Sequence, residues 1–275
     1  MSQEDKHDKV RSRNEPFVKR MATRIWQELP SADNPYIAAS ALCHGYDLFE
    51  LMEKRNFADV FYLLFRGELP NAAESALLQH LMVVLINPGP RHPATRAAMN
   101  AGIGKTDSLH ILPIASAVLG GNYMGAGEIE EAMRFLRKQQ HSNAEQFFQA
   151  LSTERMAEDS VLTENTLTPG FGARNGGIEL MAVELANRLV KLDGAGEALR
   201  WGCQFNEHLY ERGHGWLLTG VAAAVFSDLG FQPRVGGCIF QLLCSPGLVA
   251  HGLEVANKPI TAMPFVSDEN YVIER

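Results

Sequence analysis

The chain has 275 residues, of which 46% are hydrophobic, and 25 basic and 32 acidic residues give it a formal net charge of −7. This composition is typical of a globular protein with one large domain or two unequal ones, and it argues against disorder. No long basic stripe is present, which argues against nucleic-acid binding.

Residues 1–20 are rich in charge and lack the apolar segment of a secretory signal, so we expect a frayed tail on a cytoplasmic protein. The four cysteines form no Cys-x-x-Cys pair and have no paired histidines near them. This pattern predicts free thiols and no metal site. The cysteines are Cys43, Cys203, Cys238 and Cys244.

Helical periodicity dominates the chain. Alternation near residues 36–47 favours a short hairpin, the apolar stripe that starts at Phe57 predicts a helix, and Asn71 with Glu74 predicts a helix cap. Further helices are expected over 73–86, 93–100, 108–119, 128–140, 178–189, 195–211, 216–229 and 234–253. Gly194 is expected to stop a helix, and residues 152–169 to form a surface loop. The sequence therefore predicts an all-α fold with little sheet.

The apolar run 235–253 is long enough to span a membrane, but polar residues and Pro246 interrupt it. We expect a buried core helix there and no membrane contact. The stretch Gly102-Ile103-Gly104-Lys105-Thr106 fails as a phosphate-binding loop, because Met99 stands where the leading glycine is required. A turn between helices, with Lys105 in solvent, is expected instead.

Two glycine-rich loops remain. The loop from Gly120 to Gly127 is either a flexible helix connection or a ligand-facing turn at a helix N-terminus. The loop Thr168-Pro169-Gly170-Phe171-Gly172-Ala173-Arg174 is of the kind that lets the backbone approach a ligand.

Taken in order, several segments resemble the citrate synthase superfamily, with the greatest similarity to its short citryl-CoA lyase-like members. The similarity covers roughly residues 24–259. Its segments are His44-Gly45-Tyr46-Asp47-Leu48, Tyr62-Leu63-Leu64, Gly67-Glu68-Leu69-Pro70, Leu119-Gly120-Gly121, Gly170-Phe171-Gly172, Asp228-Leu229-Gly230-Phe231 and Gly247-Leu248-Val249-Ala250-His251.

The resemblance implies a helical homodimer with a disordered tail over 1–23, a large domain over 24–124 and 226–275, and a small domain over 125–225. It also implies an acyl-CoA thioester as substrate, with no tightly bound cofactor. The residues Pro169, Gly170, Phe171, Gly172, Ala173 and Arg174 would bind the coenzyme.

The family's chemistry makes or breaks a carbon–carbon bond beside a thioester, and it needs a carboxylate base and two histidines. In this chain the aligned positions hold Thr219 instead of the aspartate, and Met124 and Ala173 instead of the histidines. The family's Asp-His-Gly-Pro loop reads Asn87-Pro88-Gly89-Pro90, and a carboxylate-binding arginine is replaced by Cys244.

Two hypotheses follow. The first is an enzyme with relocated catalytic groups, for which we predict catalytic roles for Asn122, Tyr123, Arg174 and Thr219. His92, Asp107 and His214 are further candidates. The second is a catalytically inactive homologue that binds CoA compounds or regulates a partner.

Overall fold

The structure is a computed structural model that describes residues 20–157, 166–264 and 267–274. The chain divides into two compact units, Met1–Asn56 and Phe57–Arg275. Most of the predicted disordered tail, residues 1–19, lies outside the described residues. The predicted division at residues 124 and 225 into a large and a small domain stays a prediction.

The described part of the first unit is a three-stranded antiparallel sheet followed by a helix. Its elements are β1 (Trp26–Pro30), β2 (Ala38–Cys43), β3 (Tyr46–Asp47) and α1 (Leu48–Lys54). Strand β2 pairs with β3, as the hairpin expected near 36–47 requires, and also with β1. Strand β1 was not predicted, because Gln27 and Glu28 are adjacent polar residues that break its alternation.

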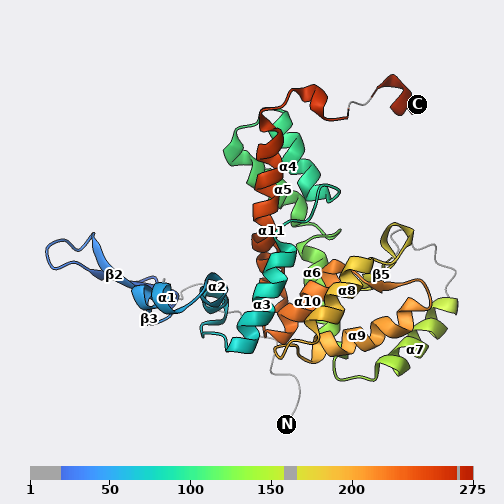
Figure 1. Ribbon diagram of the computed structural model, residues 1–275, viewed down its shortest axis with the longest axis horizontal. Coiled ribbons are helices and arrows are strands. Elements are labelled where there is room, and N and C mark those ends of the chain that lie inside the picture. The colour runs from blue at the N-terminus through green and yellow to red at the C-terminus, as the bar shows by residue number, and fades with distance from the viewer. Residues whose placement is uncertain (1–19, 158–165, 265–266, 275) are drawn as a thin grey trace, which may run out of the picture. The chain divides into compact units, whose positions relative to one another are not determined.

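The second unit is built mainly from helices, which confirms the all-α fold class (Figure 1). Its α-helices are α2 (Phe57–Arg66), α3 (Ala72–Leu85), α4 (Pro93–Ile103), α5 (Ile111–Leu119), α6 (Ala126–Gln139), α7 (Ala144–Ala157), α8 (Leu180–Leu189), α9 (Glu197–Tyr210), α10 (Leu218–Asp228) and α11 (Pro233–Ala256). The short strands β4 (Thr166–Thr168), β5 (Phe171–Gly172) and β6 (Gly215–Trp216) form a small antiparallel sheet. Single 3-10 turns lie at Ser108–His110, Arg174–Gly176, Ile260–Ala262 and Asp268–Asn270.

Most helix boundaries follow the sequence pattern. Asn71 and Glu74 form the expected capping box, in which each side chain accepts from the other residue's backbone N–H. Gly194 does not stop α8, because that helix already ends at the C-cap Val190. The expected loop 152–169 is wrong at both ends. Helix α7 continues to Ala157 and β4 occupies Thr166–Thr168, while residues 158–165 lie outside the described part. Strong helix formers around the Ser-Thr pair carry α7 through it.

Helix α11 is, within the described ranges, the one helix long and apolar enough to cross a membrane by length and composition. It packs against α4, α5 and α6, as a core helix does. Lys105 is exposed, as expected, and its ammonium group also donates to Ala256 O at 2.7 Å and to Lys258 O at 2.6 Å. These bonds form because the carbonyl end of α11 attracts a cation.

An interruption in α11 fixes the position of the loop after α3. Pro246 lies inside the helix, where its ring and missing N–H break the helical hydrogen bonding. The next amide, Gly247 N, donates instead to Ile86 O at the end of α3, at 2.9 Å. A Cβ atom at Gly247 would lie 2.6 Å from the Cα atom of Asn87. Only glycine therefore permits the loop after α3 to lie against α11.

The glycine loop 168–174 is anchored by aromatic packing and by a close backbone contact. The Phe171 ring is fully buried and stacks on Trp216, with ring centroids 4.3 Å apart. Gly170 has a left-handed φ of 87°, and its carbonyl accepts from Leu217 N at 3.0 Å. A Cβ atom at Gly220 would lie 2.1 Å from that carbonyl oxygen. These contacts hold the loop over the first turn of α10.

Candidate functional site

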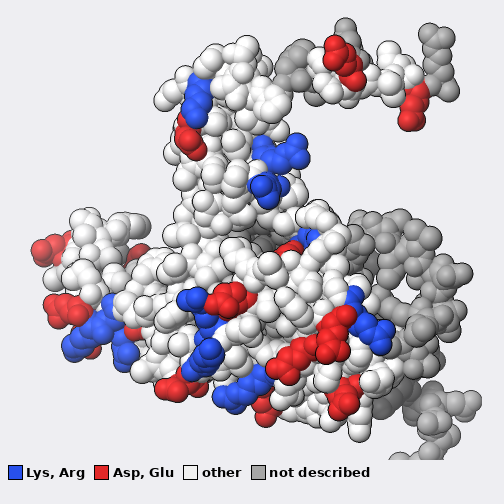
Figure 2. Space-filling model, turned by 45° about the vertical axis from the view of Figure 1, so that its right-hand side comes forward, with Lys and Arg blue, Asp and Glu red and all other residues white. Residues whose placement is uncertain are grey.

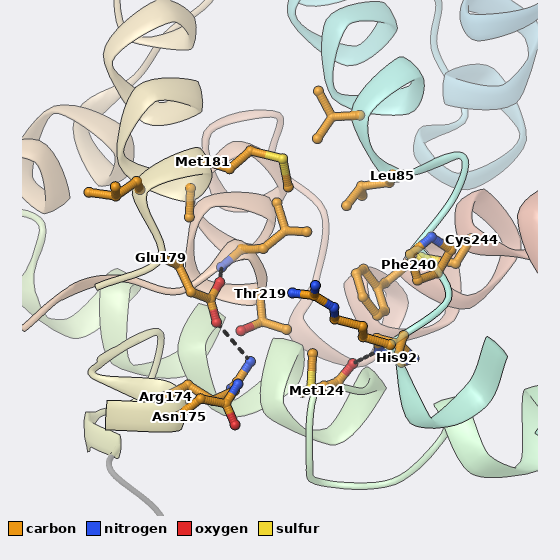
Figure 3. A pocket seen from close by; sticks show the side chains of 16 residues that line it. Leu85, His92, Met124, Arg174, Asn175, Glu179, Met181, Thr219, Phe240 and Cys244 are labelled. Atoms are coloured by element: carbon orange, nitrogen blue, oxygen red, sulfur yellow. Dashed lines mark hydrogen bonds and ion pairs between the residues drawn. The ribbon is translucent and has the colours of Figure 1, made fainter. Parts of the chain in front are cut away.

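A cavity of about 370 Å³ lies in the second unit, among α3, α8, α10, α11 and the loops that precede α4 and α6 (Figure 3). Two of its walls are held by the close contacts described above: Gly247 packs the loop after α3 against α11, and Gly170 packs the loop 168–174 against α10. The lining residues are Val84, Leu85, Pro88, Arg91, His92, Met124, Arg174, Asn175, Glu179, Leu180, Met181, Ala182, Leu218, Thr219, Phe240 and Cys244.

Some of the positions singled out from the sequence meet at this cavity. Met124, Thr219 and Cys244 line it together with Pro88 of the loop after α3. Ala173, which the resemblance aligns with a histidine of the family, directly precedes the lining residue Arg174. Segments that are far apart in the chain therefore converge on one concave surface, as a ligand site requires.

A buried ionic cluster occupies one side of the site. The Glu128 carboxylate accepts from Arg174 Nη2 at 2.6 Å, from the Thr219 hydroxyl at 2.7 Å and from Met124 N at 2.8 Å. The Arg174 and Glu128 side chains are only 4% and 9% exposed, so water screens this ion pair little. Thr219 is thus a hydrogen-bond donor to a carboxylate.

Glu179 is the carboxylate that lines the cavity itself. Its Oε1 lies 3.4 Å from Arg174 Nη1, and its Oε2 accepts from Leu218 N at 2.9 Å, where α10 begins. The side chain is 26% exposed, which leaves part of it accessible from the cavity. In Figure 3 the Glu179 carboxylate points toward Arg174 and Thr219. One carboxylate is therefore available to a bound molecule.

His92 lies in the loop before α4, where it is buried, and both of its ring nitrogens form hydrogen bonds. Its Nδ1 accepts from Ala94 N at 3.1 Å, so the ring is neutral and Nε2–H donates to Met124 O at 2.9 Å. Burial lowers the pKa of His92, the backbone of Met124 raises it, and the Arg174 cation lowers it further. A neutral His92 fixes the Met124 loop and has no free nitrogen with which to take a proton.

Two other lining residues have contrasting chemistry. Cys244 is buried, and burial raises the pKa of its thiol to about 12, so it is a neutral group at physiological pH. Arg91 is exposed to solvent although it also lines the cavity. The cavity thus has a cation on its solvent side and a weakly polar thiol in its interior.

Several residues predicted from the sequence do not line the cavity. Tyr123 is 47% exposed and its ring lies 5.3 Å from the Arg174 guanidinium carbon, while Asn122 is exposed and lies over Gly127. Their predicted catalytic roles stay predictions. Asp107 caps a 3-10 turn, and the His214 ring contacts Arg212 O.

Within the predicted coenzyme loop, only Arg174 lines the cavity. Gly170, Phe171 and Gly172 are buried, and Pro169 and Ala173 are partly buried. Because the Phe171 side chain packs inside the protein, any contact of this residue with a ligand would have to come from its backbone. Its role in binding coenzyme stays a prediction. Within the described residues, no group of three or more His, Cys, Asp or Glu side chains could hold a metal ion.

The sequence reasoning missed Glu128 and Glu179. For Glu128 a signal existed, because Glu128, Ala132 and Leu136 follow one another at helical spacing and the other two are fully buried. An acidic residue on an apolar stripe must find a buried partner. Glu179 lies just before α8, and nothing in its neighbourhood of the sequence marks it.

The fold is similar to that of solved citryl-CoA lyase and citrate synthase structures. The similarity extends over 93% of this chain and 94% of the citryl-CoA lyase from Hydrogenobacter thermophilus, with 23% identity and a TM-score of 0.73. Citrate synthase from Thermotoga maritima matches 94% of this chain and 96% of its own, with 15% identity and a TM-score of 0.51.

An ATP citrate lyase from Methanothrix soehngenii, solved with citrate and coenzyme A, is also similar. The match covers 93% of this chain and 44% of that longer one, with 17% identity and a TM-score of 0.66. By sequence alone, no known protein family matches the chain, and no curated protein matches it either. The citrate synthase-like fold expected from the sequence is therefore confirmed, and the comparisons establish the fold alone.

Proposed function

We propose that this chain is a citryl-CoA lyase-like protein that binds a CoA thioester in the cavity and makes or breaks a carbon–carbon bond beside the thioester. The observation that carries the proposal is the convergence of Met124, Thr219 and Arg174 on one cavity. A neighbour of the same fold was solved with citrate and coenzyme A, which supports a CoA ligand for this chain.

In such a reaction the α-carbon of the thioester loses a proton to a base, and the resulting enolate attacks a carbonyl carbon; the lyase direction is the reverse. Glu179 is the best-placed base, because its carboxylate lines the cavity and is partly exposed. Glu128 is not suited to this role, because three donors already occupy its oxygens.

Binding and turnover test this proposal separately. Coenzyme A and acetyl-CoA are expected to raise the melting temperature, since a ligand at about 100 times its Kd adds about 2.7 kcal/mol to stability. Exchange of the acetyl α-protons for deuterium, followed by NMR, reports enolisation directly. Glu179→Gln should abolish that exchange. Glu184→Gln, on the exposed side of α8, should leave it unchanged. Failure of every CoA compound to bind would overturn the proposal.

The second candidate function is binding without catalysis. It is favoured by the contacts of Glu179, whose two oxygens both have partners, Arg174 and Leu218 N. A carboxylate held by two partners is less free to move to the α-proton of a bound thioester. Acetyl-CoA that binds but exchanges no α-protons would favour this second function.

The protein is further proposed to be a homodimer. Helices α4, α5 and α11 lie side by side, and Figure 2 shows few charged side chains over this part. Large apolar side chains are nevertheless exposed there, including Val118 at 40%, Leu242 at 50% and Leu253 at 46%. Exposed apolar surface of this kind marks an interface. Sedimentation equilibrium should report a dimer, which Val118→Glu weakens.

A further inference from the structure

The interior of the cavity differs in charge and polarity from one side to the other, and this difference bears on which acyl group could bind. In Figure 3, Arg174 and Glu179 lie on one side, and Leu85 and Met181 on the other. The inference below rests on the proposed function, because it assumes that a thioester enters this cavity.

The buried cation of the cavity is already neutralised. Arg174 donates to Glu128 through Nη2 and to Glu179 through Nη1. Its Nε–H has no partner among the described residues, but this atom is buried and exposes no surface to a ligand. A ligand carboxylate that approached Arg174 would have to displace a protein carboxylate and would lie beside two like charges.

The other side of the cavity is apolar. Leu85 and Phe240 are 2% and 3% exposed and form the buried part of that wall together with Cys244. Leu180 and Met181, in the first turn of α8, are 65% and 69% exposed although both line the cavity. A bound alkyl chain would cover these two side chains and remove their apolar surface from water.

We propose that the acyl group of the thioester lies in this cavity. The cavity takes an uncharged alkyl chain and rejects an acyl group with a terminal carboxylate. The specificity-determining residues are Met181 and Cys244, which offer the chain apolar or neutral surface, and Glu179, which repels an anion. Cys244 matters because a neutral buried thiol cannot bind a carboxylate as a guanidinium group would.

Arg91 offers the competing interpretation. It is an exposed cation on the cavity wall, and it could bind either a phosphate of coenzyme A or a carboxylate at the end of an acyl group. The two cases differ in their consequence. If Arg91 binds a phosphate, Arg91→Gln weakens all acyl-CoA compounds by the same factor. If it binds the acyl carboxylate, the substitution weakens only compounds that carry one.

The test compares pentanoyl-CoA with glutaryl-CoA, which differ by a methyl group against a carboxylate at the chain end. Titration calorimetry gives both affinities, with acetyl-CoA as the reference. Each buried methylene is worth about fourfold in affinity, so pentanoyl-CoA is expected to bind roughly sixtyfold more tightly than acetyl-CoA at full burial. Glutaryl-CoA is expected to bind at least about tenfold more weakly than pentanoyl-CoA.

A charge variant provides the matched control. Met181→Lys adds a cation to the apolar wall at an exposed position, so the fold should tolerate it, and it should reverse the preference in favour of glutaryl-CoA. Val83→Lys adds the same charge at a position that is 73% exposed and outside the lining of this cavity. It should leave the preference as it is.

Three outcomes would overturn the inference. The first is glutaryl-CoA binding as tightly as pentanoyl-CoA. The second is a loss of affinity in Arg91→Gln that affects glutaryl-CoA but not pentanoyl-CoA, and the third is an identical response to both lysine variants. If no CoA compound binds, the pentanoyl and glutaryl thioesters of N-acetylcysteamine replace them. Selective binding of the pentanoyl compound would then support the inference while the CoA proposal fails, and no binding would refute both.

Discussion

Removal of the Glu128 charge should destabilise the protein strongly. In Glu128→Gln, Arg174 keeps only its 3.4 Å contact with Glu179, and the Thr219 and Met124 donors face a neutral amide. Breaking a buried ion pair from one side costs about 3–5 kcal/mol, and the remaining contact places this variant near the lower value. For a domain of this size, about 3 kcal/mol corresponds to a fall of roughly 6–12 °C in melting temperature.

Urea denaturation of wild type and variant measures this loss. Glu130→Gln is the matched control, because Glu130 lies on the same helix and pairs with Arg134 at the surface, where the side chains are 33% and 57% exposed. A surface pair of this kind is worth at most about 1 kcal/mol. If the two variants lose the same stability, the cluster is not the buried, unscreened network described above. A double variant, Glu128→Gln with Arg174→Gln, should recover part of the loss because it leaves no unpaired buried charge.

Other predictions concern single residues of the site and its supports. Because burial lowers the pKa of His92 below 6.5, the unfolded state takes up a proton at a higher pH than the folded state does. The free energy of unfolding is therefore expected to fall as the pH drops below 6.5, by up to about 1.4 kcal/mol per pH unit, and His92→Gln should reduce this slope in urea titrations. Gly170→Ala should cost about 2–5 kcal/mol, since it combines a left-handed φ with a clash. The clash arises because a Cβ atom at position 170 would lie 2.8 Å from Gly220 Cα. Gly176 also has a positive φ but has open space around the added Cβ atom, so Gly176→Ala should lose less stability. Iodoacetamide, followed by mass spectrometry of the folded protein, should label the exposed Cys238 before the buried Cys244, and equal labelling would contradict the burial of Cys244.

The sequence predicted the features that depend on neighbouring residues. The capping box at Asn71 and Glu74 is set by residues three positions apart, and most helices of the second unit follow from their apolar periodicity. Helix α7 was not predicted, and its last residues were assigned to the loop over 152–169, because the Ser-Thr pair inside it has the composition of a turn while the residues around it favour a helix. Local rules of propensity compete at such points, and the sequence alone does not show which one prevails.

The ionic cluster could not be predicted by local rules. Glu128 lies 46 positions from Arg174 and 91 positions from Thr219, and only the fold brings the three together. The resemblance to a known family identified Met124 and Thr219 as positions of interest, but it drew attention to what those positions lack. It gave no indication that carboxylates from other positions, Glu128 and Glu179, would lie beside them.

The two carboxylates have different consequences for function. The Thr219 hydroxyl lies 2.7 Å from Glu128 Oε1, so an aspartate at position 219 would place two carboxylates in contact in a buried site. Like charges at that separation do not both stay ionised. The present cluster is thus incompatible with a charged aspartate at position 219, the position that the resemblance aligns with the family's aspartate. Under the proposed function, the partly exposed Glu179 is the carboxylate left to take the α-proton, and the deuterium-exchange test of Glu179→Gln decides between catalysis and binding alone.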